Sequence, residues 1–157
     1  MQETAVWTVD TVLPGLVVLK GDRSNYSGGA HGYGFSDALI WDSKANKVLR
    51  FDGLFTDSAA AKALITPFYC KALDEARRDV RSEPTPKDDI FGKCPDLYKE
   101  AVVTPTTIVG GKYGRLAITL APYVAGPYSE GEYGLSIYIP DGLKTLIKPQ
   151  YRGLFPG

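Results

Sequence analysis

The sequence contains few of the side chains on which most metal sites and catalytic centres depend. Its 157 residues include one histidine, His31, two cysteines, Cys70 and Cys94, and one methionine. Zinc is usually held by four protein ligands, mostly cysteine and histidine, in structural sites. Because these residue types are so scarce, we expect neither a metal nor another cofactor.

The chain also lacks an excess of charge and a long apolar segment. Eighteen basic and eighteen acidic side chains give a formal net charge of +0. A dedicated nucleic-acid or anionic-membrane binder needs a basic surface, so we expect neither partner. No apolar stretch approaches the roughly 20 residues of a membrane helix. The first residues lack the basic and apolar segments of a signal peptide, so we expect that a leader, anchor or upstream domain precedes this chain in a longer protein.

The remaining composition is that of a globular protein. Hydrophobic residues make up 44% of the chain and charged residues 23%, and the length fits one domain, residues 1–157. Residues 115–120 and 134–139 alternate apolar and polar side chains, which is typical of antiparallel strands lying on a core. Further strands are expected at residues 5–9, 15–20, 35–41 and 47–51. With helices between the two groups of strands, the pattern predicts an α+β fold, a mainly antiparallel sheet with helices packed on one face.

The helical region follows residue 57. Asp57 or Ser58 is suited to cap a helix that begins there. Because proline is tolerated in the first helical turn, we expect Thr66 and Pro67 to start a second helix. An apolar stripe on this second helix is predicted at Tyr69, Ala72, Leu73, Ala76 and Val80.

The two cysteines lie on either side of a charged, proline-containing loop. Cys70 lies at the margin of the helical stripe, from which it can reach that loop. In an oxidising compartment a disulfide between Cys70 and Cys94 is the natural interpretation. Two unrelated thiols remain the alternative.

The histidine lies in a glycine-rich run at residues 26–34. Glycine adopts positive φ at little cost, so such a run can form tight turns and approach a partner closely. Serines and aspartates nearby would allow a Ser/His/Asp set, but no nucleophile-elbow motif supports one. We therefore expect His31 to hold the loop in shape, with acid–base catalysis as the alternative.

A second glycine-rich segment, residues 121–133, contains two carboxylates. Glu130 and Glu132 flank Gly131. Paired carboxylates hydrolyse glycosides when they lie on opposite sides of a substrate, and neighbours on one loop are poorly placed for that. We expect these glutamates to lie at a solvated hairpin tip.

Tyrosines gather in and beside these two segments. Tyrosine offers a rigid apolar face with a polar tip, which suits protein interfaces and stacking on sugar rings. A simple role in covering the sheet is equally open. The six tyrosines concerned are Tyr26, Tyr33, Tyr123, Tyr128, Tyr133 and Tyr138.

Four motifs together resemble a known family. They are Tyr-Ser-Gly-Gly-Ala-His at residues 26–31, Leu-Arg-Phe-Asp-Gly-Leu-Phe at 49–55, Ala-Pro-Tyr-Val-Ala-Gly-Pro-Tyr-Ser-Glu-Gly at 121–131 and Ile-Tyr-Ile-Pro at 137–140. From about residue 17 to 147, the chain resembles the extracytoplasmic domain of unknown function at the C-terminus of the anti-sigma factor RsiV. The same domain occurs in some peptidoglycan deacetylases.

The resemblance implies an α+β domain outside the cytoplasm, periplasmic or lipid-anchored, excised here from a longer envelope protein. In the anti-sigma factor this domain is a receptor that binds lysozyme, and in the deacetylases another domain carries the catalysis. No catalytic set accompanies the motifs. The resemblance therefore predicts a non-catalytic binding domain at the bacterial cell envelope, whose partner is a lysozyme-like protein or a peptidoglycan fragment.

The candidate ligand-binding residues lie in the two glycine-rich segments. Two other functions remain open: an accessory to a cell-wall hydrolase or deacetylase, with His31 or Glu130 transferring a proton, and a purely structural envelope module. The candidate ligand-binding residues are Tyr26, His31, Tyr33, Tyr123, Tyr128, Glu130 and Tyr133.

Overall fold

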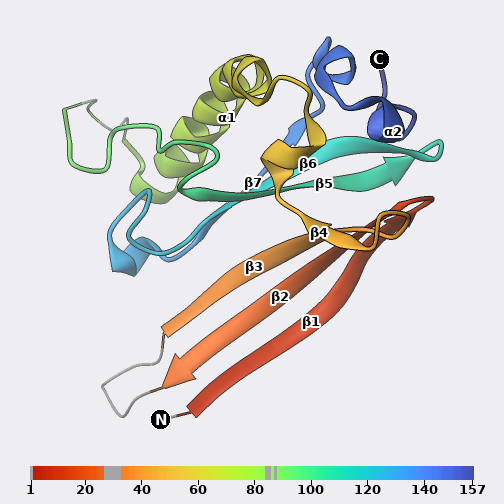
Figure 1. Ribbon diagram of the computed structural model, residues 1–157. Coiled ribbons are helices and arrows are strands. Elements are labelled where there is room, and N and C mark those ends of the chain that lie inside the picture. The colour runs from red at the N-terminus through yellow and green to blue at the C-terminus, as the bar shows by residue number, and fades with distance from the viewer. Residues whose placement is uncertain (1, 27–32, 84–85, 87) are drawn as a thin grey trace.

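In a computed structural model, which describes residues 2–26, 33–83, 86 and 88–157, two antiparallel sheets and one long helix form the fold (Figure 1). The expected α+β class is confirmed, but the described strands form two sheets instead of one. The first sheet has the order β1-β2-β3-β4, with β1 at Gln2–Leu13, β2 at Leu16–Tyr26, β3 at Tyr33–Asp42 and β4 at Lys47–Leu49. The second has the order β5-β6-β7, with β5 at Ala101–Val109, β6 at Lys112–Leu120 and β7 at Tyr133–Tyr138.

Tight turns join most neighbouring strands, as their sequences predict. Gly15, at φ +92°, closes the β1–β2 hairpin, and Asn46, at φ +57°, lies in the β3–β4 turn. The strand β5 was not among those expected. It contains Pro105, which cannot donate a backbone hydrogen bond, but β5 lies at a sheet edge where one side needs no partner.

The long helix α1 (Ser58–Arg81) runs through Pro67 without ending, so the predicted break is wrong. The hydroxyl of Thr66 donates to the carbonyl of Lys62, 2.6 Å away, and does not cap a new helix. Burial on both sides of the proline outweighs the local cost of the missing hydrogen bond. The buried apolar side chains on this face are Ala61, Ile65, Tyr69 and Leu73.

The start of α1 is as expected, but its predicted stripe is partly wrong. Asp57 caps the helix, accepting the backbone N–H of Ala60 at 3.0 Å. Val80 is 55% exposed, whereas Arg77 is buried with only 1% of its surface accessible. The reason is that the last turns of α1 face the polar backbone of neighbouring loops, which bind a guanidinium better than a valine.

The helix and both sheets share one core. α1 packs on β7, and β5 crosses the inner face of the first sheet, where the hydroxyl of Thr106 donates to Asp10 at 2.9 Å. The C-terminal helix α2 (Pro149–Arg152) places Tyr151 so that its hydroxyl donates to the buried Asp42. The buried apolar residues of all these elements form a continuous cluster.

Cys70 and Cys94 form the predicted disulfide, with their Cα atoms 5.6 Å apart. It ties the middle of α1 to the loop that precedes β5. Among the described helices, none combines the length and the apolar character needed to cross a membrane.

Candidate binding surface around the tyrosine loop

Four of the residues predicted to bind a ligand lie on one segment, residues 121–133, which joins β6 to β7 and is called the tyrosine loop below. They are Tyr123, Tyr128, Glu130 and Tyr133. Of the others, Tyr26 ends β2 and Tyr33 begins β3. His31 lies outside the described residues.

Two arginines on α1 hold the tyrosine loop against the helix. Arg77 donates from Nε to the carbonyl of Ala125 at 3.0 Å and from Nη2 to the carbonyl of Lys93 at 2.8 Å. Arg81 donates from Nη2 to the same Ala125 carbonyl at 3.4 Å. Burial lowers the pKa of the Arg77 guanidinium. Nothing in the sequence indicates this role for Arg77, because a charged residue on a helix is usually solvated.

Glu130 is the anion of this arrangement. Its two oxygens accept from Nε and Nη2 of Arg81 at 2.7 and 2.8 Å, and Oε1 also accepts the Tyr133 hydroxyl at 2.7 Å. These bonds, with Arg81 first, lower the pKa of Glu130. A Cβ at Gly126 would collide with Glu130, so a glycine is needed there. The expectation of a solvated tip is wrong for Glu130, whose side chain is only 12% exposed.

Glu132 is also engaged. Its carboxylate accepts the backbone N–H of Ser36 at 2.7 Å and the Ser36 hydroxyl at 2.9 Å. Ser36 lies on β3, three residues after the strand begins at Tyr33. The tyrosine loop therefore lies beside the part of β3 that follows the histidine-containing run.

Tyr123 and Tyr128 form an aromatic pair on the surface of the loop. Their ring centroids are 5.4 Å apart with an interplanar angle of 34°. Tyr123 is 60% exposed, and its backbone has a φ of +74°, which is rare for a bulky residue. Such strained conformations persist where the surroundings enforce them and are frequent at functional sites. The pair thus presents an ordered aromatic surface to solvent.

A pocket of about 370 Å³ lies against the tyrosine loop at Pro127 and Glu130. Three carboxylates and one guanidinium line it, and since Arg81 is paired with Glu130, the carboxylates of Glu83 and Asp89 leave it acidic. Ile90 at its rim is 86% exposed. The described lining residues are Arg81, Glu83, Pro86, Asp89, Ile90, Phe91, Pro127 and Glu130.

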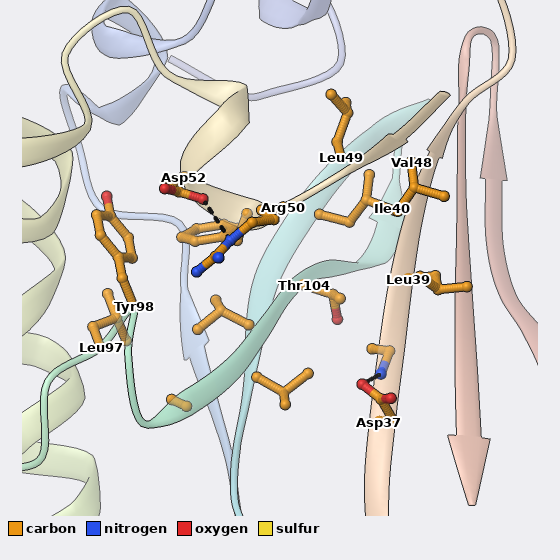
Figure 2. Close-up of a pocket in the computed structure, with 15 residues that line it drawn as sticks. Asp37, Leu39, Ile40, Val48, Leu49, Arg50, Asp52, Leu97, Tyr98 and Thr104 are labelled. Atoms are coloured by element: carbon orange, nitrogen blue, oxygen red, sulfur yellow. Dashed lines mark hydrogen bonds and ion pairs between the residues drawn. The ribbon is translucent and has the colours of Figure 1, made fainter. Parts of the chain in front are cut away.

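A second pocket, of about 320 Å³, lies between β3, β4 and β5 (Figure 2). Its apolar wall includes Ile40 and Leu49, and Arg50 pairs with Asp52 at 3.5 Å on its rim. Tyr123, Tyr128, Glu130 and Tyr133, the predicted ligand-binding residues whose side chains the structure describes, do not line it. One wall comes from residues 48–52, which overlap the second motif of the family resemblance. Four residues of that motif, Leu49, Phe51, Leu54 and Phe55, are buried in the core, so the motif contributes to packing.

No protein-family model matches the sequence, and no curated protein does. Two solved structures are similar to the whole fold. A DUF3298 family protein from Pseudomonas aeruginosa PAO1 has a TM-score of 0.54 and 23% identity, and a DUF3298 family member from Bacteroides fragilis NCTC 9343 has 0.67 and 18%. The chain shares the fold of DUF3298 proteins.

The similarity to these DUF3298 structures extends over 99% and 97% of this chain but only 64% and 56% of theirs. This chain therefore spans less than two thirds of their length. At such low identity the likeness shows the fold alone.

Proposed function

We propose that this chain is a non-catalytic, extracytoplasmic binding domain of the bacterial envelope, whose tyrosine loop and neighbouring acidic pocket bind a basic, lysozyme-like protein. The observation that carries the proposal is the position of the pocket. Two carboxylates, Glu83 and Asp89, line the pocket in addition to the Arg81–Glu130 pair, beside the exposed apolar side chain of Ile90 and next to the turn that bears Tyr128. Basic side chains of a partner would enter the pocket while aromatic residues anchor the contact.

Local charge matters here because the chain as a whole is neutral. A receptor for a strongly basic protein needs surplus acid at the contact, even where its net charge supplies none. In the proposed complex, Glu83 and Asp89 at the pocket supply that acid. Glu130 has a different part in it, since its pairing with Arg81 orders the loop and it does not face the partner.

A peptidoglycan fragment is the second candidate, favoured by the Tyr123–Tyr128 pair. Tyrosine rings stack on sugar rings, and a pair already packed together loses little conformational freedom on binding. This partner would contact the rings more than the acidic pocket. The two candidates therefore predict different sensitivities to substitution.

Proton transfer by Glu130 is poorly supported. A general acid in glycoside hydrolysis needs a carboxyl group whose pKa is raised. The bonds from Arg81 and Tyr133 lower the pKa of Glu130 instead, so it stays ionised. A His31→Ala variant tests the remaining catalytic alternative. Loss of a wall-degrading activity with the fold intact would contradict the binding proposal.

An extracytoplasmic location is supported by the disulfide between Cys70 and Cys94. Disulfides persist in oxidising compartments and are rare in the cytosol. Labelling of free thiols in unfolded, unreduced protein from the native compartment would test it. Two labelled thiols would contradict this part of the proposal.

Calorimetric titration with lysozyme, and in parallel with soluble peptidoglycan fragments, tests the function. We expect saturable binding to lysozyme that Asp89→Asn and Tyr123→Ala each weaken at least about tenfold, or about 1.4 kcal/mol. Tyr138→Ala is the matched control, because Tyr138 is 74% exposed but lies on β7, outside the loop. Binding to the fragments alone, sensitive to Tyr123→Ala but not to Asp89→Asn, would favour the glycan. No binding to either partner would refute both candidates.

A further inference from the structure

The first sheet carries apolar side chains on both of its faces. Leu16, Val18 and Ile40 face the core and are buried. The strand register places a second apolar set on the opposite side, called the outer face below: Val9, Leu19 and Leu39 are partners in one row, and Val12, Val17, Trp41 and Val48 in the next. Trp7 lies one step further along β1, opposite Gly21.

The outer face is open to solvent. Val9 and Val12 are each 61% exposed and Val48 is 54% exposed. In Figure 2, the side chains of Leu39 and Ile40 project to opposite sides of β3. β5 packs on the inner face, and among the described elements none lies over the outer one (Figure 1). A sheet with one solvated face normally carries polar side chains there, so this pattern is typical of a sheet covered on both sides.

Trp7 extends the outer face toward the free end of the sheet. Its ring lies flat on Gly21, where a Cβ would be only 2.9 Å from the ring atoms. Arg23 lies over the ring at 5.7 Å from its centroid and pairs with Asp37 at 3.5 Å. The charges at this end nearly cancel, because Arg23 and Asp37 pair and, of the described residues, only Glu3, further along β1 on the same side, adds one acid, so the outer face has no large excess of either sign.

We infer that a second copy of this chain covers the outer face, so that two first sheets pack against each other around a two-fold axis. Twisted sheets pack face to face at about −30° and about 10 Å, and a two-fold interface brings the same patch of both subunits together. The charges favour a second copy over other occupants. An anionic membrane would need basic residues around the outer face, and a strongly charged partner would need an excess of the opposite charge there. Two copies of this chain do not repel each other, because each has the matched Arg23–Asp37 pair and a net charge of zero.

Tryptophan fluorescence can report the pairing of two outer faces, because both tryptophans of the chain, Trp7 and Trp41, lie on this face. Light scattering after size exclusion should give twice the 17.1 kDa of one chain. On dilution the dimer should dissociate, so that the mass falls to that of one chain. Tryptophan emission should then shift to the red, because the indole rings become exposed to water.

Val9→Lys should give a monomer at every concentration, with emission already red-shifted. It places a charge on the outer face at a position that is exposed in one chain, so the fold should be kept, and its circular dichroism melt should match that of the wild type diluted to the single chain. The control is Val80→Lys, because Val80 has a similar exposure of 55% but lies on α1. This variant should remain a dimer.

Three results would overturn the inference. The first is a wild-type chain that stays monomeric over the whole concentration range. The second is a dimer that survives Val9→Lys. The third is a monomer whose tryptophan emission shifts to the blue on addition of vesicles containing anionic lipid, which would make the occupant of the outer face a membrane.

Discussion

Arg81 and Glu130 form a two-bond ion pair that joins the last turn of α1 to the tyrosine loop, with distances of 2.7 Å from Nε to Oε2 and 2.8 Å from Nη2 to Oε1. Both side chains are largely buried, at 18% and 12% exposure. Such paired geometry fixes orientation as well as distance. The position of the aromatic pair, Tyr123 and Tyr128, therefore depends on this contact.

Glu130→Gln should destabilise the domain because it leaves the Arg81 guanidinium without its counter-charge. Breaking a fully buried pair costs about 3–5 kcal/mol, and since both groups keep some solvent contact we expect about 2 kcal/mol. Urea denaturation measures the change. Arg78→Gln is the control, as Arg78 is exposed on the same helix. Equal effects of the two substitutions would contradict a structural role for the pair.

The pH dependence of stability should follow from the same pair. The pKa of Glu130 is lower in the folded chain than the ordinary 4.5, chiefly through the Arg81 hydrogen bonds. The folded state thus binds fewer protons, so the stabilisation is complete above about pH 4.5 and is lost as pH falls through the folded pKa. Denaturation midpoints measured across this acidic range should fall less steeply for Glu130→Gln. Parallel slopes for the two proteins would exclude the mechanism.

Reduction of the disulfide should lower stability. Cys70 and Cys94 are 24 residues apart, and opening a loop of that length is worth about 3.5 kcal/mol in the chain-entropy model. The double variant Cys70→Ser, Cys94→Ser should show this loss in chemical denaturation. Reductant should shift the midpoint of the wild type but not of the variant. An unchanged wild-type midpoint under full reduction would refute the prediction.

Tyr151→Phe should destabilise the contact between α2 and the first sheet. The Tyr151 hydroxyl donates to Asp42, which also accepts the backbone N–H groups of Lys44 and Ala45 at 3.0 and 2.9 Å. Losing one partner of a buried carboxylate costs about 1–3 kcal/mol. Hydrogen exchange of Lys44 and Ala45 should also accelerate. The burial of Tyr151 and its bond to Asp42 raise its pKa to about 12, so the hydroxyl stays protonated at neutral pH.

Much of the fold follows from local patterns. Alternating side chains predict β6 and β7, and the polar turn at residues 42–46 predicts the β3–β4 hairpin. β5 is missed because Pro105 and the positive φ of Thr107 interrupt its pattern. The tyrosine loop could be singled out by composition, but the partners of its glutamates could not, since Glu132 meets Ser36 across 96 residues of sequence.

The sequence by itself determined the α+β class, and it restricted the helix cap to Asp57 or Ser58 and any disulfide to Cys70 with Cys94, because these depend on periodicity, on neighbouring residues and on how many cysteines there are. Only the tertiary structure decided that α1 continues through Pro67 and that Arg77 is buried. Packing against distant segments outweighs local propensity at both positions. The same holds for the outer face, because the register of the four strands β1 to β4 is needed to show that its apolar residues share one side.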